Sequence, residues 1–214
     1  MTTQDILNAV IGLEEENVVR LVKQELDKQT EVSAILNGGL ISAMDEVGRR
    51  FNEGELFVPE MLRAGRAMKA GLEILRPLLS STDLEPAGIV VIGTVKGDLH
   101  DIGKNLVAMM LEGAGFNVID LGVDVDADKF LAAVKGNNAD IVAMSALLTT
   151  TMSMMKNTID VLTEDGLRDQ IKVMVGGAPV TQSFADEIGV EGYSEDAVTA
   201  VQMARKLVGT KPRI

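Results

Sequence analysis

The chain of 214 residues lacks cysteine and contains a single histidine, His100. Without cysteine it can form no disulfide, no thiolate zinc site and no iron–sulfur cluster, and one histidine is too few for the usual multi-histidine metal site. A transition metal would therefore have to arrive inside a cofactor that already supplies most of its ligands.

Long apolar runs and basic clusters are also missing. No window approaches the ~18 consecutive apolar residues of a membrane-spanning helix, and the N-terminal Met-Thr-Thr-Gln-Asp lacks a signal pattern, so we expect a cytoplasmic protein. The net charge is −12, with no tryptophan and one tyrosine. Such a surface repels nucleic acid and anionic membranes, and no aromatic series offsets the repulsion, so we expect neither as a partner.

The first 80 residues carry apolar side chains at helical intervals. Two stripes precede residue 28, a third runs from about Glu31 to Phe51, and a fourth begins near Pro59, which suits the first turn of a helix. Short connections between four helices are typical of a small bundle. We predict an all-α four-helix cap domain over residues 1–80 and a linker and hinge over 81–87, where the composition changes.

From residue 88 to 214, apolar runs alternate with helical segments, which predicts a second domain of α/β type. Strands are expected at 88–93, 117–121, 140–145, 171–175 and 190–193, with helices at 101–114, 126–136, 152–164, 181–188 and 195–208. Mostly apolar strands predict a five-stranded parallel sheet covered on both faces, Rossmann-like and flavodoxin-like. In such sheets ligands bind at the carboxyl ends of the strands.

Three loops at that edge contain residues suited to ligand binding. The first carries Asp98, His100 and Gly103, the second is the hydroxyl-rich run 145–151, and the third is Gly176-Gly177. Imidazole is the commonest metal ligand, and glycines allow close approach of a bulky ligand. No Gly-x-Gly-x-x-Gly or Walker motif follows a strand, which disfavours dinucleotides and P-loop nucleotides.

The order Asp98-x-His100-x-x-Gly103, Ser145-x-Leu147, Gly176-Gly177 resembles the signature of cobalamin-binding domains of the methionine synthase type. Residues 51–61, Phe-Asn-Glu-Gly-Glu-Leu-Phe-Val-Pro-Glu-Met, resemble the helical cap of that family. A chain with only these two parts resembles the corrinoid proteins of methylamine, methanol and quaternary-amine methyltransferase systems.

The resemblance implies that His100 binds cobalt from the lower face and displaces the cofactor's own base, while Asp98 accepts a hydrogen bond from the other ring nitrogen. Thr151 stands where the family pattern has serine and would complete a catalytic relay with these two residues; alternatively it caps the following helix. Further cofactor contacts are implied for Gly97, Leu99, Asp101, Ile102, Gly103, Ser145, Leu147, Thr149, Gly176, Gly177 and Tyr193.

Structural alternatives accompany several of these assignments. The two glycines could serve a tight turn, and Tyr193 could simply pack. Lys104 could meet a phosphate or be solvated. By resemblance, Phe51, Val58 and Met61 would lie over the cobalt-bound methyl group, although the same residue types suit a bundle core.

The implied function is that of a methyl carrier within a multi-protein system. Cobalt of the bound cobalamin, which is methylcobalamin when loaded, would accept a methyl group from a methylated amine or similar donor through a substrate-specific corrinoid methyltransferase. A second methyltransferase would pass it to a thiol or tetrahydrofolate, and a reductive activase is a third expected partner. The alternative is a cobalamin-dependent sensor or regulator, for which the chain lacks the length and basic surface of a DNA-binding output domain.

Overall fold

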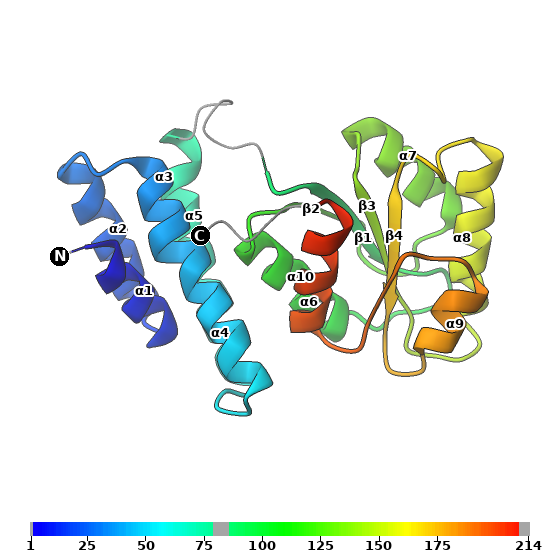
Figure 1. Cartoon of the computed structure of the whole chain (residues 1–214), viewed down its shortest axis with the longest axis horizontal. Helices are drawn as coiled ribbons and strands as arrows, with labels where there is room; N and C mark the ends of the chain where they lie inside the picture. Colours follow the sequence, from blue (N-terminus) through cyan, green and yellow to red (C-terminus); the bar gives the residue numbers. More distant parts are fainter. Residues whose placement is uncertain (1, 79–85, 210–214) are drawn as a thin grey trace. The chain divides into compact units, whose positions relative to one another are not determined.

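The computed structural model describes residues 2–78 and 86–209, which form two compact units (Figure 1). One unit is helical and N-terminal; the other begins at Pro86 and contains the sheet. The predicted linker at 81–87 lies outside the described residues except for Pro86 and Ala87. Among the described helices, none combines the length and apolar character needed to cross a lipid bilayer.

The helical unit contains the four helices that the apolar stripes predict. They are α1 (Thr3–Ile11), α2 (Glu15–Asp27), one continuous helix made of α3 (Val32–Ala34), η1 (Ile35–Ile41) and α4 (Ser42–Asn52), and α5 (Val58–Leu75), with a short turn, η2 (Arg76–Leu78), after it. The stripe residues Ile6, Val18, Leu40, Val47 and Met68 are buried. Burial of one apolar face per helix is what stabilises such a bundle.

The third helix differs from the uniform helix that its apolar pattern predicts, because η1 is π-helical. The amide of Ser42 donates to the carbonyl of Asn37, five residues back. At Gly39 a Cβ atom would lie 3.1 Å from Cγ2 of Ile6 on α1, so the helices approach closely where glycine is present.

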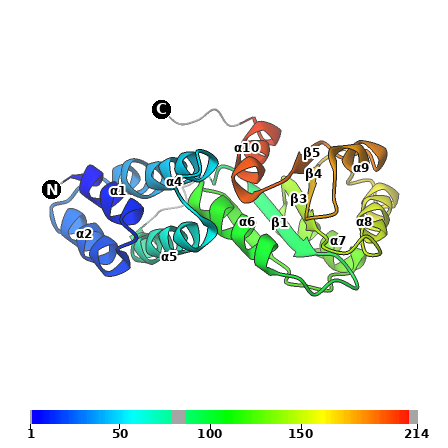
Figure 2. The same ribbon diagram turned by 90° about the horizontal axis from the view of Figure 1, so that it is seen from below.

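The α/β unit has one parallel sheet in the order β2-β1-β3-β4-β5, which confirms the flavodoxin-like prediction. Its strands are β1 (Ile89–Thr94), β2 (Asn117–Asp120), β3 (Ile141–Ser145), β4 (Lys172–Gly176) and β5 (Gly192–Ser194). Its helices are α6 (Ile102–Gly113), α7 (Ala127–Asn137), α8 (Ser153–Glu164), α9 (Gln182–Glu187) and α10 (Ala197–Leu207). Helices α6 and α10 cover one face of the sheet, and α7, α8 and α9 cover the other (Figure 2).

The register of the sheet aligns the carboxyl ends of four strands. Thr94 pairs with Ser145, Ser145 with Gly176, and Gly176 with Ser194. Strands β1, β3 and β4 are buried along most of their length, so this row of ends is fixed by the core. The loops that leave the row meet at one edge, where the candidate site lies.

Candidate functional site

The turn after β1 brings Asp98 to this edge. The carbonyl of Val95 accepts a hydrogen bond of 3.1 Å from the amide of Asp98, which closes a four-residue turn. Gly97, the third residue of that turn, has a φ of +82°, a left-handed conformation that favours glycine. This local geometry turns the Asp98 side chain toward the loop that follows β3.

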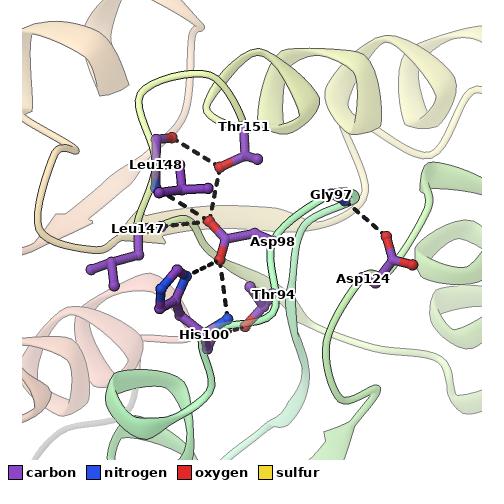
Figure 3. Close-up of polar contacts among 8 residues, drawn as sticks. All are labelled: Thr94, Gly97, Asp98, His100, Asp124, Leu147, Leu148 and Thr151. Atoms are coloured by element: carbon purple, nitrogen blue, oxygen red, sulfur yellow. Dashed lines mark hydrogen bonds and ion pairs between the residues drawn. The ribbon is translucent and has the colours of Figure 1, made fainter.

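Asp98 is fully buried and accepts five hydrogen bonds (Figure 3). Its Oδ1 accepts from the His100 amide at 3.1 Å and lies 2.7 Å from His100 Nδ1. Its Oδ2 accepts from the amides of Leu147 at 2.7 Å and Leu148 at 3.3 Å, and from the hydroxyl of Thr151 at 2.8 Å. A buried carboxylate needs donors of this kind to replace water.

These donors decide the charge of Asp98. Burial by itself raises the pKa of a carboxyl, but the hydrogen bonds from Leu147, from His100 and from Thr151 outweigh burial and hold the pKa of Asp98 well below its usual range. An ionised carboxylate can only accept, so Nδ1 of His100 must carry the proton that is shared with it. In its neutral form the ring therefore carries its lone pair on Nε2.

His100 is held by its backbone and by one ring nitrogen, while its side chain is 50% exposed. Among the described residues, Nε2 has no hydrogen-bond partner. The carbonyl of His100 accepts a bond of 2.8 Å from the buried hydroxyl of Thr94, a residue that sequence reasoning missed. The backbone contacts of His100 and the hydrogen bond at Nδ1 therefore fix the orientation of the ring, and Nε2 is free to bind a ligand.

Exposed residues lie next to His100 in the chain and in the loop that follows β3. Leu99 is 71% exposed and Ile102 is 78% exposed, and Leu147 and Leu148 are exposed as well. The predicted contacts Asp101, Gly103 and Thr149 are also exposed. Large exposed apolar side chains beside a polar centre are typical of a surface that binds a bulky ligand.

Thr151 uses its hydroxyl within this network. The side chain is buried, and Oγ1 lies 2.8 Å from both Asp98 Oδ2 and the Leu148 carbonyl. Helix α8 begins two residues later, at Ser153, with no side-chain cap on its first turn. The structure therefore places the hydroxyl on Asp98 and Leu148, and not on the amides of α8 as the capping alternative expects.

The glycine pair after β4 is required by backbone packing. Gly177 has a φ of +124°, and a Cβ atom there would lie 1.9 Å from the carbonyl oxygen of Ala146. A Cβ on Gly176 would lie 2.9 Å from the backbone oxygen of Ser194. The tight-turn alternative thus accounts for both glycines by itself, and their contact with a cofactor stays a prediction.

Two other predicted contacts occupy the strand ends. Ser145 ends β3, is partly buried, and accepts a bond of 3.0 Å from the Val95 amide through its carbonyl. Tyr193 lies in β5 and packs, partly buried, against the core cluster on the α7–α9 side of the sheet. Packing therefore explains Tyr193, and cofactor roles for both residues stay predictions.

Lys104 corrects a sequence-based expectation. It is only 3% exposed, and its Nζ lies 2.7 and 2.6 Å from the two carboxylate oxygens of Asp120 and 2.6 Å from Asn105 Oδ1. The expectation of a solvated lysine is wrong, and the ammonium group is already engaged. Asp120 ends β2, so this pair ties the first turn of α6 to the edge strand.

The predicted cap residues belong to the helical unit. Met61 is fully buried, Phe51 is partly buried, and Val58 is exposed. Burial of Met61 suits the bundle-core alternative. The role of all three over a cofactor stays a prediction.

Both units resemble known cobalamin-binding proteins. Family models described as "B12 binding domain" match residues 88–202 and residues 2–76. A dimethylamine corrinoid protein of Methanosarcina barkeri is 44% identical over 206 residues, covering 96% of each chain.

Solved structures are similar over nearly the whole chain. A cobalamin-binding protein from Desulfitobacterium hafniense is 32% identical with a TM-score of 0.80, covering 97% of this chain and 98% of that one. A chain of the methanol:cobalamin methyltransferase complex MtaBC from Methanosarcina barkeri is 32% identical with a TM-score of 0.88, covering 98% and 80%.

Proposed function

Because the chain belongs to the family of cobalamin-binding corrinoid proteins of methyltransferase systems, we propose that it carries methyl groups between two methyltransferases, with His100 as the protein ligand to cobalt. The observation that carries this proposal is the state of the His100 ring. Its Nδ1 is bonded to a buried carboxylate and its Nε2 is free among the described residues.

The residues present fit the cofactor. The described residues contain no group of three acidic, histidine or cysteine side chains that could hold a metal ion, whereas His100 offers one nitrogen, which suits a metal whose other ligands come with it. The exposed side chains of Leu99, Ile102, Leu147 and Leu148 suit the broad apolar face of a corrin ring. Bound cobalamin would supply a cobalt centre able to accept a methyl group and release it to an acceptor.

Asp98 would tune the ligand in two ways. By holding the proton on Nδ1 it keeps the lone pair on Nε2, and a carboxylate behind an imidazole raises the basicity of the ligating nitrogen. By accepting from both the amide and the ring of His100 on a single oxygen, it also fixes the ring's orientation. The amides of Leu147 and Leu148 and the hydroxyl of Thr151 hold Asp98 itself in place.

The finer parts of the proposal concern donor, acceptor and partners. The 44% identical relative is a dimethylamine corrinoid protein, which supports a methylated amine as the donor. The similar chain of MtaBC belongs to a complex with methyltransferase activity, which supports a methyltransferase as the direct partner. Transfer to a thiol or tetrahydrofolate by a second methyltransferase, maintenance by a reductive activase, and shielding of the reactive face by Phe51, Val58 and Met61 complete the proposal.

Transfer of a labelled methyl group tests this function. The chain is loaded with cobalamin, reduced, and incubated with a dimethylamine-specific corrinoid methyltransferase and [¹⁴C]dimethylamine; parallel reactions use trimethylamine, monomethylamine and methanol with their own methyltransferases. We expect label to co-elute with the chain for one donor and to leave it when an acceptor methyltransferase and thiol are added.

The proposal would be contradicted if the chain bound cobalamin stoichiometrically but acquired no label from any of the four methyl donors. His100→Ala, checked for native circular dichroism, is the variant in which loading should fall.

A further inference from the structure

The loop after β2 runs beside the turn that carries His100. Two main-chain hydrogen bonds join it to the end of β1: the Thr94 amide donates to Gly122 at 3.0 Å, and the Val125 amide donates to Thr94 at 3.0 Å. A third joins it to the turn itself, because the Asp124 amide donates to the Asp98 carbonyl at 3.0 Å. A parallel bridge between Val95 and Val125 continues the contact. The turn is therefore supported from the β2 side as well as from the β3 side.

Asp124 adds a side-chain contact to this support. Its Oδ1 accepts a hydrogen bond of 2.8 Å from the amide of Gly97 (Figure 3). Lys96 Nζ lies 3.4 Å from the same carboxylate. Asp124 has a φ of +52°, a left-handed conformation that is uncommon for a residue with a side chain and that Asp and Asn tolerate best. Asp124 thus makes two hydrogen bonds to the turn: its carboxylate accepts from the Gly97 amide, and its own amide donates to the Asp98 carbonyl.

The hydrogen bond from Gly97 to Asp124 matters because Gly97 directly precedes Asp98 in the turn. Gly97 precedes Asp98 and is itself left-handed, and one main-chain bond of 3.1 Å from Asp98 to Val95 closes the turn. Asp98 is held through its carboxylate by five donors, whereas the amide of Gly97, the residue before it, donates to the carboxylate of Asp124. A change in the backbone conformation of Gly97 would therefore change the direction in which the Asp98 side chain points, and with it the hydrogen bonds to the Asp98 carboxylate.

We propose that Asp124 is a positioning residue that holds the turn at 95–100 in the conformation that presents His100 to the cofactor. This inference rests on the proposed function, because it concerns the same ligand, but it makes a separate claim about the chain without cofactor. Because Asp124 holds the turn in place before the cofactor binds, the entropy cost of ordering the turn does not weaken the affinity for the cofactor.

Three substitutions separate the parts of this role. Asp124→Asn keeps a side-chain oxygen and tolerance of the left-handed backbone but removes the charge. Asp124→Gly keeps only the backbone freedom, and Asp124→Ala keeps neither. Asn138→Gly is the matched control, because Asn138, the C-cap of α7, is also left-handed, with a φ of +49°, and lies outside the turn.

The single histidine makes the test specific, since every imidazole signal in the spectrum comes from His100. Amide exchange at Gly97 and the ¹⁵N shifts of the ring are measured by NMR on the full chain without cofactor. We expect Gly97 exchange to rise about tenfold in Asp124→Gly and Asp124→Ala, because the Gly97 amide loses its carboxylate acceptor in both variants. Asp124→Asn should stay within a few-fold of wild type, and Asn138→Gly should not change it.

The same variants are then loaded with cobalamin, and the fraction with a histidine nitrogen on cobalt is measured from the spectrum across pH. That fraction should fall in Asp124→Gly and be rescued in Asp124→Asn. Wild-type values for Gly97 exchange and ring shifts in Asp124→Gly would overturn the inference, and so would an Asp124→Asn variant as impaired as Asp124→Gly. If wild-type protein shows no histidine ligation, the proposed function fails, while the exchange data still decide whether Asp124 anchors the turn.

Discussion

Replacing Thr151 by valine tests how strongly the buried network holds Asp98. The substitution keeps the branched shape and removes the hydroxyl that lies 2.8 Å from Asp98 Oδ2. The oxygen would keep its bonds from Leu147 at 2.7 Å and Leu148 at 3.3 Å, so one of its three donors is lost. A hydrogen bond to a charged group is worth about 1.5–3 kcal/mol, and we expect the free energy of unfolding to fall by about that amount.

Thr151→Ser is the matched control. It keeps the hydroxyl and removes the methyl group, which lies beside Gly97. Loss of this methyl group should lower the free energy of unfolding by about 0.8 kcal/mol. Unfolding in urea can be followed by the fluorescence of Tyr193, the only tyrosine, since the chain lacks tryptophan and Tyr193 lies in β5 of the α/β unit. At a slope of about 2 kcal/mol per molar urea, the valine variant should unfold about 1 M earlier than wild type. Equal midpoints for the two variants would refute the bond to Asp98.

Two further predictions concern the same edge of the sheet. The pKa of Asp98 is lower in the folded than in the unfolded chain, where it is about 3.9, so its stabilisation is complete above that pH and is lost as the pH falls toward the folded value. Urea midpoints measured from pH 6 down to pH 3 should therefore fall more steeply for wild type than for Asp98→Asn, and equal slopes would contradict the shift. Gly177→Ala should cost at least about 2 kcal/mol, because its Cβ would lie 1.9 Å from Ala146 and its φ is +124°. Gly136→Ala, in open space within α7, should be neutral or stabilising by up to about 1 kcal/mol, and the same thermal midpoint for both variants would show that the steric argument fails.

The arrangement of the three loops follows from the sequence for a physical reason. Alternating apolar strands and helices predict a parallel sheet, and in such a sheet the carboxyl ends of successive strands share an edge. Thr94, Ser145 and Gly176 do end in register, so motifs separated by many residues meet there. Residue type and spacing were sufficient for this part of the site.

The donors around Asp98 could not be predicted in the same way. Three of them are main-chain amides, of His100, Leu147 and Leu148, and since every residue except proline carries such a group, no residue type marks them. The contact of Asp124 with Gly97 joins residues 27 apart through a left-handed backbone that the sequence does not specify.

Burial of Lys104 likewise depends on tertiary structure. Its partner Asp120 comes to it only because β2 pairs with β1 beside α6. The close approach of Ile6 on α1 to Gly39, within the π-helical segment Ile35–Ile41, also joins residues far apart in the sequence, which periodicity alone does not reveal. In both cases local sequence allows several outcomes, and long-range packing selects one of them.

Ligation of cobalt by His100 is the central claim, and electron paramagnetic resonance of isotopically labelled protein tests it directly. The chain is produced with ¹⁵N-labelled histidine, loaded with unlabelled cobalamin and reduced to the Co(II) form. Because His100 is the only histidine, a ligating ring nitrogen from the protein must be ¹⁵N, which splits each cobalt line into a doublet. A doublet in the labelled protein and a triplet in the unlabelled protein are the predicted result. A triplet in both would show that the cofactor's own base, and not His100, occupies the lower position.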